Sequence, residues 1–156
     1  MNPTLRSLLR SLPAIVWMSM IWLFSNQPGG GSGALSRRIM AFLARFGIDF
    51  QAWFGESALW VLRKCAHFTE YMLLFFLLLL AFTVKWEWKT ARWWAWLGVF
   101  LYACSDEFHQ LFIPGRVGDL ADVAIDTSGG LMGLVLASLW MWLKRSRKAA
   151  ANLPSN

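Results

Sequence analysis

Four mainly apolar stretches of helical length divide the chain, and polar or glycine-rich segments separate them. A bilayer core is about 30 Å thick, so an α-helix needs about 20 mainly apolar residues to cross it. We therefore predict an all-α, polytopic membrane protein with about four transmembrane helices, built as a single domain over residues 1–156. The predicted spans cover approximately residues 8–24, 65–84, 93–112 and 121–143.

The segment between the first two spans, residues 35–62, is predicted to form interfacial helices. From Leu35 to Ile48, apolar residues recur at spacings of three and four, and arginines lie mostly on the opposite side. This pattern is typical of an amphipathic helix that lies on the membrane surface or caps the spans. Residues 50–62 are expected to form a second short helix that leads into the second span.

The first apolar stretch also has features of a signal peptide. Arg6 and Arg10 precede a short apolar core, and small residues follow Pro28. Trp17 and Trp22 are bulky for a signal core. We predict an uncleaved span, although length alone does not separate the two alternatives.

The composition favours a membrane protein. Hydrophobic residues make up 57% of the chain and charged residues 15%, whereas soluble domains carry about 25% charged residues. The eleven tryptophans gather mainly near the predicted span ends, where the indole ring prefers the membrane–water interface. An aromatic belt therefore explains them better than base stacking does, and we predict no nucleic-acid binding.

The net charge of +6 is explained by membrane topology. Cytoplasmic loops and tails of membrane proteins carry an excess of Lys and Arg. An even number of spans puts both termini on one side, and the termini with the second loop carry more basic residues than the opposite face does. Both termini are therefore predicted to be cytoplasmic. The basic residues on that side are Arg6, Arg10, Lys85, Lys89, Arg92, Lys144, Arg145, Arg147 and Lys148.

Charged residues occupy three span ends that this topology places on the outer side of the membrane. Charge in or beside a bilayer is costly, so it usually has a partner and a role. We therefore expect one shared polar layer at the level of the outer leaflet. Its members are Arg63, Lys64, His67 and Glu70 at the start of the second span, Asp106, Glu107, His109 and Gln110 at the end of the third, and Arg116, Asp122 and Asp126 before or in the fourth.

Helical spacing predicts which of these side chains lie together, because residues three and four apart share a helix face. The predicted groups are Lys64, His67 and Tyr71 with Glu70 beside them; Asp106, His109 and Gln110 with Glu107 turned about 100° away; and Asp119, Asp122 and Asp126.

The residues alone leave three roles open for the polar layer. The first is a structural network in which Glu70 pairs with Arg63, Lys64 or Arg116. The second is a metal site, because carboxylates suit Mg²⁺ or Ca²⁺ and added His suits Zn²⁺ or Mn²⁺. The third is a metal-free functional site. The candidate metal ligands are Asp106, His109, Asp122 and Asp126, and the candidate acid–base residues are Glu70, His67, Asp106 and His109.

Cysteines and glycines point to packing rather than chemistry. Cys65 and Cys104 form no CxxC motif, and they could pair only in an oxidising compartment. Lone cysteines usually serve as small buried residues. Whether Cys65 and Cys104 form a disulfide stays open. Gly129 and Gly133 form a small-xxx-small pair, which allows close helix packing in the last span.

Three blocks of the chain combine polar residues with aromatic, proline or glycine residues. The blocks are Phe24-Ser25-Asn26-Gln27-Pro28; Arg63-Lys64 with Ala66-His67-Phe68 and Glu70-Tyr71; and Ser105-Asp106-Glu107, His109-Gln110 and Phe112-Ile113-Pro114-Gly115-Arg116 with Asp122, Asp126, Thr127 and Gly129. In these blocks the chain resembles the VanZ-like membrane protein family. Two positions depart from its pattern: Phe75 stands where the family often has Gly, and Asp119 is an additional acid.

The resemblance implies a multi-pass protein of the bacterial cytoplasmic (inner) membrane and cell envelope. The named member of the family is associated with resistance to the glycopeptide teicoplanin. We accordingly expect binding of an envelope lipid, a lipid-linked cell-wall precursor or a lipoglycopeptide. The alternative is a metal-assisted membrane enzyme acting on a lipid-linked phosphate or acyl substrate. The expected binding residues are Arg63, Lys64, Glu107, Gln110, Arg116, Asp122 and Asp126.

Overall fold

The computed structural model describes residues 2–27 and 29–151, and these contain helices but no strand. The all-α prediction is therefore confirmed. In chain order the helices are α1 (Pro3–Ser25), α2 (Gly29–Ala44), α3 (Phe50–Phe54), the 3₁₀ turn η1 (Gly55–Ser57), α4 (Ala58–Phe82), α5 (Trp88–Gln110) and α6 (Leu120–Ala151).

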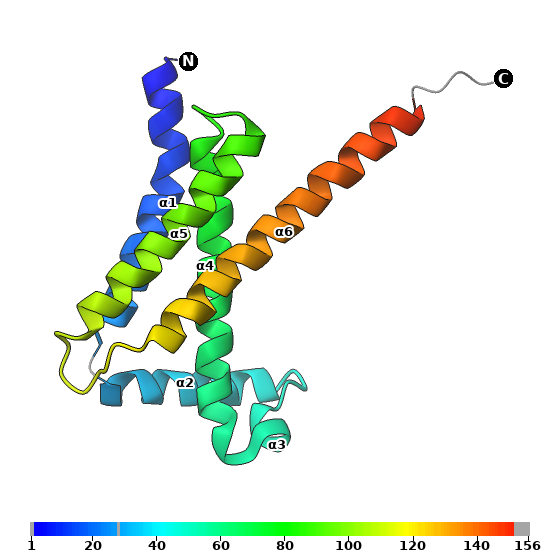
Figure 1. The fold of residues 1–156 in the computed structure, drawn as a ribbon. Helices are drawn as coiled ribbons and strands as arrows, with labels where there is room; N and C mark the ends of the chain where they lie inside the picture. The colour runs from blue at the N-terminus through cyan, green and yellow to red at the C-terminus, as the bar shows by residue number, and fades with distance from the viewer. Residues whose placement is uncertain (1, 28, 152–156) are drawn as a thin grey trace.

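Helix α4 is the central element, and it contacts every other helix of the described chain. Figure 1 shows α1 and α5 on one side of α4, while α6 crosses α4 obliquely and splays away toward the C-terminus. Helix α2 runs across the lower ends of the long helices, with α3 beside it. Both termini and the α4–α5 turn lie at one end of the bundle, and α2, α3 and the α5–α6 loop lie at the other.

Three helical segments are long and apolar enough to cross a membrane: Thr4–Ser25, Phe50–Phe82 and Leu120–Lys148. Helix α5 has 23 residues, which is long enough, but Lys89, Arg92 and several tryptophans lower its hydropathy. Its crossing of the membrane therefore stays a prediction.

Small residues let the long helices approach closely. On α5, Ala91, Ala95, Val99 and Ala103 recur every four residues and are fully buried. On α6, a Cβ added at Gly129 would lie 2.1 Å from the carbonyl oxygen of Phe68 on α4. Glycine is thus required where α6 crosses α4, as the small-xxx-small spacing predicted.

Phe75, which departs from the family pattern, has a defined place in this packing. Its side chain is 0% exposed. A Cβ added at Gly133 would lie 2.7 Å from Phe75 Cδ1, so the ring fills the notch that this glycine leaves on α6.

The interfacial segment differs in detail from the prediction. Asp49 caps α3, accepting a hydrogen bond of 3.0 Å from the backbone N–H of Ala52. The helix ends after five residues because Gly55 adopts a φ of +55°, a conformation that favours glycine. Residues 58–62, predicted to end the second interfacial helix, instead form the first turns of α4. Helix α5 ends at Gln110, and α6 continues beyond residue 143 to Ala151.

Candidate functional site

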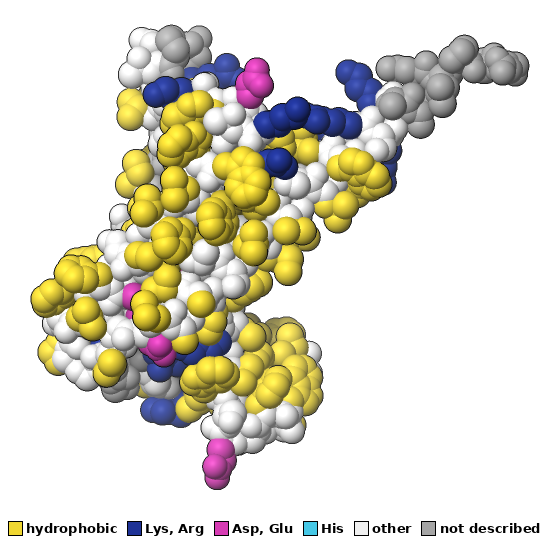
Figure 2. Space-filling view, in the orientation of Figure 1, with side chains coloured by type: hydrophobic (Ala, Val, Ile, Leu, Met, Phe, Trp, Pro, Cys, Tyr) yellow, Lys and Arg dark blue, Asp and Glu magenta, His cyan; other side chains and the backbone are white. Residues whose placement is uncertain are grey.

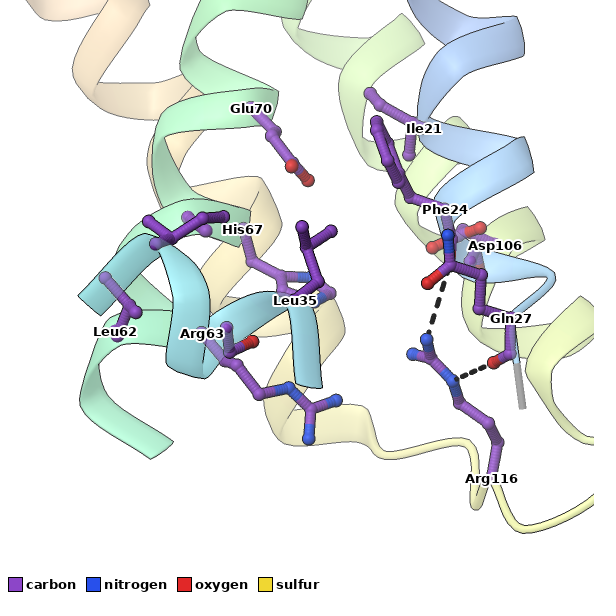
Figure 3. Close-up of a pocket in the computed structure, with 14 residues that line it drawn as sticks. Ile21, Phe24, Gln27, Leu35, Leu62, Arg63, His67, Glu70, Asp106 and Arg116 are labelled. Atoms are coloured by element: carbon purple, nitrogen blue, oxygen red, sulfur yellow. Dashed lines mark hydrogen bonds between the residues drawn. The ribbon is translucent and has the colours of Figure 1, made fainter. Parts of the chain in front are cut away.

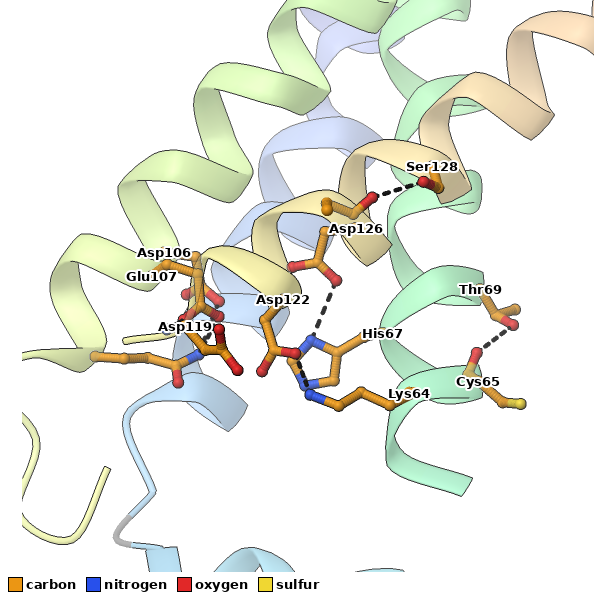
Figure 4. Close-up of polar contacts among 12 residues, drawn as sticks. Lys64, Cys65, His67, Thr69, Asp106, Glu107, Asp119, Asp122, Asp126 and Ser128 are labelled. Carbon is orange, nitrogen blue, oxygen red and sulfur yellow. Dashed lines mark hydrogen bonds and ion pairs between the residues drawn. The ribbon is translucent and has the colours of Figure 1, made fainter. Parts of the chain in front are cut away.

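Two polar pairs join α4 to α6 at the end of the bundle opposite the termini (Figure 4). Lys64 forms an ion pair with Asp122. Four residues further along α6, Asp126 Oδ1 lies 3.2 Å from Nδ1 of His67, within hydrogen-bond distance. Asp126 is 0% exposed, so among the described residues His67 supplies the one polar partner of a fully buried carboxyl group.

The start of α6 is fixed by hydrogen bonds from backbone N–H groups to acidic side chains, one of which lies on α5. The backbone N–H of Ala121 donates to Asp119 Oδ1 over 2.8 Å, so Asp119 caps the helix. The backbone N–H of Asp119 itself donates to Glu107 Oε2 over 2.9 Å. Asp119, the additional acid of the sequence, therefore caps α6 instead of joining Asp122 and Asp126 in the polar pairs.

The end of α5 buries three polar side chains together. Gln110 Nε2 donates to Asp106 Oδ2 over 3.3 Å and to Glu107 Oε1 over 3.2 Å. Asp106, Glu107 and Gln110 are all buried. Both carboxyl groups therefore accept hydrogen bonds from the Gln110 amide rather than from a cationic side chain. Asp106 Oδ1 has no hydrogen-bond partner among the described residues.

His109 faces a different direction from the other candidate metal ligands. Its Nε2 lies 3.4 Å from Asn26 Oδ1, and its ring stacks on Trp22 with centroids 5.4 Å apart. Across the described chain, no group of three or more His, Cys, Asp or Glu is placed to hold a metal ion. The predicted ligands Asp106, His109, Asp122 and Asp126 thus do not converge, because His109 turns toward α1.

Arg116, in the α5–α6 loop, ties that loop to the end of α1. Its Nε and Nη2 donate to the carbonyl oxygens of Gln27 and Phe24 over 3.1 and 3.3 Å, and its Nη1 donates to Gln110 Oε1 over 3.5 Å. A cation is favourable at a helix C-terminus. Burial lowers the pKa of the Arg116 guanidinium, and the nearby charge of Arg63 lowers it further.

A cavity of about 200 Å³ lies between α1, α2 and α4, with Asp106 and Arg116 completing its lining. One part of its wall is apolar, including Ile21, Phe24, Leu35 and Ile39. The rest is polar or charged, and Figure 3 shows Glu70 on one side of the space and Arg63 and Arg116 on another. The charged wall consists of Arg63, His67, Glu70, Asp106 and Arg116.

The predicted structural ion pair of Glu70 is not observed. Only Lys64–Asp122 and His67–Asp126 form ion pairs within residues 2–27 and 29–151. The Glu70 backbone carbonyl accepts a hydrogen bond of 3.0 Å from Trp17 Nε1, which holds α1 against α4 while the carboxyl group faces the cavity. Glu70 is therefore available to a ligand.

A second cavity, of about 280 Å³ and more polar, lies beside the first. Arg63 and Arg116 line both cavities, so they stand between an amphipathic space and a polar one. Lys64 and Asp122 line only the polar cavity.

The contributions of α1 and α2 to the site had only a weak signal in the sequence. The Phe24–Pro28 block pointed to the end of α1, but no role could be given to it. In the structure Ser25 and Gln27 line the first cavity, as do Leu35 and Ile39 of α2. Cys65 and Cys104 are both free, with Cys65 exposed on α4.

Fold and site together define a small helical membrane protein with a buried polar layer and an amphipathic cavity at one end. A family model described as VanZ/LLP1 matches residues 11–141. The chain belongs to this family. No curated protein and no solved structure matches the chain significantly.

Proposed function

We propose that this VanZ-family membrane protein binds the headgroup of an envelope lipid or lipid-linked precursor in the cavity between α1, α2 and α4. The observation that carries the proposal is that Arg63 and Arg116 line a cavity whose remaining wall is partly apolar. Neither arginine forms an ion pair with a carboxylate in the described part of the chain. Guanidinium groups bind phosphate through paired N–H donors, so two of them beside an apolar wall suit a phospholipid.

The size of the cavity is consistent with a headgroup. Pockets for drug-sized ligands measure about 300 Å³ or more, whereas this one measures about 200 Å³. The acyl chains would lie outside it, along exposed apolar side chains of α1 and α2 such as Leu23 and Phe42. Arg116 also holds three structural contacts, which leaves Arg63 as the cleaner probe of binding.

We further propose that the termini are cytoplasmic and that the cavity lies at the outer leaflet of the inner membrane. Basic residues concentrate at the end that carries the termini, as the dark blue side chains at the top of Figure 2 illustrate. An outward cavity is compatible with the association of the family's named member with teicoplanin, which acts outside the cell on lipid-linked precursors.

Replacing Arg63 tests the proposal. Arg63→Ala removes a cation that makes no structural hydrogen bond or ion pair among the described residues, so the fold should keep its melting temperature. A charge-assisted hydrogen bond contributes about 1.5–3 kcal/mol, so anionic lipid should bind about 10- to 100-fold more weakly. Native mass spectrometry of the detergent-purified protein, titrated with lipid, measures this change.

Arg45→Ala is the matched control, because Arg45 is an exposed arginine at the same end of the molecule. It should bind lipid as the wild type does. Equal lipid affinity in Arg63→Ala and the wild type would contradict the proposal.

A further inference from the structure

The first cavity presents unsatisfied acceptors as well as the two arginines. Asp106 is 4% exposed and Ser25 is 6% exposed. Asp106 Oδ1 and Ser25 Oγ both lack a hydrogen-bond partner among the described residues. The Glu70 carboxyl group completes the set, and the three residues come from α5, α1 and α4. Burying a polar or charged group without a partner is costly, so this arrangement indicates a missing donor.

The neighbouring basic side chains do not supply that donor. Lys64 is paired with Asp122, and His67 contacts Asp126. Arg116 directs its hydrogen bonds to Phe24, Gln27 and Gln110. These acceptors therefore belong to cavity-lining residues and have no cation of the described chain bound to them.

The chemistry of the acceptors fits a primary ammonium group. An ammonium carries three N–H donors, and Ser25, Glu70 and Asp106, which line the cavity from three helices, offer one acceptor group each. A divalent metal fits less well, since the described residues provide no group of three His, Cys, Asp or Glu placed to hold one. A quaternary ammonium also fits poorly, because it has no N–H to donate.

We propose that the ligand is zwitterionic: a lipid whose headgroup carries a primary ammonium and a phosphate, as in a phosphoethanolamine headgroup. The ammonium binds Ser25, Glu70 and Asp106, and the phosphate faces Arg63 and Arg116. Arg63 lies seven residues before Glu70 on α4, about 10 Å closer to the N-terminal end of the helix. The phosphate therefore lies nearer that end of α4, and the ammonium lies further along the helix. This assignment rests on the proposed lipid binding and adds the ammonium group to it.

The test compares three phospholipids that share their acyl chains and differ in the headgroup: ethanolamine, choline and glycerol. Purified full-length protein is titrated with each lipid, and binding is measured by native mass spectrometry. We expect the ethanolamine lipid to bind at least about 10-fold more tightly than the other two, as expected for one charge-assisted contact. Choline keeps the phosphate and the positive charge but lacks N–H donors, so it isolates the hydrogen bonds.

Glu70→Gln should remove most of the preference for ethanolamine while leaving the glycerol lipid bound as before. Glu56→Gln is the control, since Glu56 is an exposed acid of η1 at the same end of the molecule. Ser25→Ala is a second, milder variant that removes a single acceptor, and it should reduce the preference several-fold without lowering the melting temperature.

The outcomes separate this inference from the proposed function. A wild type that binds the glycerol lipid as well as the ethanolamine lipid overturns the ammonium site and leaves lipid binding standing. Absence of binding to all three lipids overturns both. Displacement of the lipid by soluble phosphoethanolamine at equal concentration overturns the assignment to a lipid in favour of a soluble ligand.

Discussion

At the scale of single residues, the role of each charged side chain depends on whether another group of the protein binds it. His67 and Lys64 are paired with Asp126 and Asp122. Arg116 donates hydrogen bonds to the carbonyl oxygens of Phe24, in the last turn of α1, and of Gln27, just after α1. Arg63 and Glu70 keep their charged groups free of such contacts within the described chain. The first group holds α4, α6 and the α5–α6 loop together, and the second group lines the cavity, which Arg116 also lines.

The pair of His67 and Asp126 gives a prediction at this scale. Asp126 is fully buried, and its Oδ2 has no partner among the residues described. Removing one member of a buried pair leaves an uncompensated group and costs about 3–5 kcal/mol. His67→Ala should lower the free energy of unfolding by that amount, measured by denaturation in detergent, while Thr69→Ala on the exposed side of α4 should change it by far less.

The double variant His67→Ala with Asp126→Asn serves as the check on that explanation. It removes the stranded carboxylate and should recover part of the lost stability. A double variant as unstable as the sum of the two single changes would show that the two side chains do not interact.

At the scale of the elements, the crossing of α4 and α6 positions the site. Asp126 and Gly129 are three residues apart on α6, so the close approach at Gly129 also brings Asp126 against α4. Helix α5 contributes its alanine face and its polar end, and α2 lines the cavity with Leu35 and Ile39. The position of the charged side chains therefore depends on the close packing of α6 on α4 at Gly129, which carries no charge itself.

Gly129→Ala should disrupt this crossing. Its Cβ would meet the Phe68 carbonyl oxygen at 2.1 Å, and backbone cannot move aside as a side chain can. Overpacking a well-packed core costs about 1–3 kcal/mol and occasionally more, so the melting temperature should fall. Gly98→Ala is the matched control, because its Cβ would meet side chains rather than backbone, with Leu78 Cδ1 at 3.1 Å and Phe82 Cε2 at 3.9 Å. Similar melting temperatures for the two variants would contradict the close approach.

At the scale of the whole molecule, the bundle has two chemically different ends. The termini and the α4–α5 turn lie at one end, and α2 and α3 lie at the other (Figure 1). The cavity is lined by α2 residues and so lies at that second end. The two ends therefore face opposite sides of the membrane if all four long helices cross it. The basic residues favour the cytoplasm for the end that carries the termini.

Thiol labelling in intact cells tests this orientation. Both native cysteines are free, so a background with Cys65→Ser and Cys104→Ser is compatible with the fold. A Glu56→Cys variant in η1 should react with a membrane-impermeant maleimide in intact cells, whereas Ser146→Cys near the end of α6 should react only after lysis. The reverse pattern would place the cavity on the cytoplasmic side.

Much of the candidate site could be predicted from the order of residues. The charges around His67, Asp106 and Asp126 lie at the ends of apolar stretches, and the cost of charge in a bilayer made a shared polar layer predictable. The face of His109 could not be predicted in the same way. Its spacing from Asp106 placed both on one side of α5, but the position of α1 decides that His109 meets Trp22 and Asn26.

The sequence by itself determined the helical class, the approximate positions of the long helices and the end of the molecule at which polar residues gather, because these depend on local hydrophobicity and its periodicity along the chain. The tertiary structure alone decided which acid meets which base, and that Arg63, Glu70 and Asp106 face one cavity. These features depend on the angle and register at which α1, α2 and α6 pack on α4, and contacts between residues far apart in the chain set that geometry.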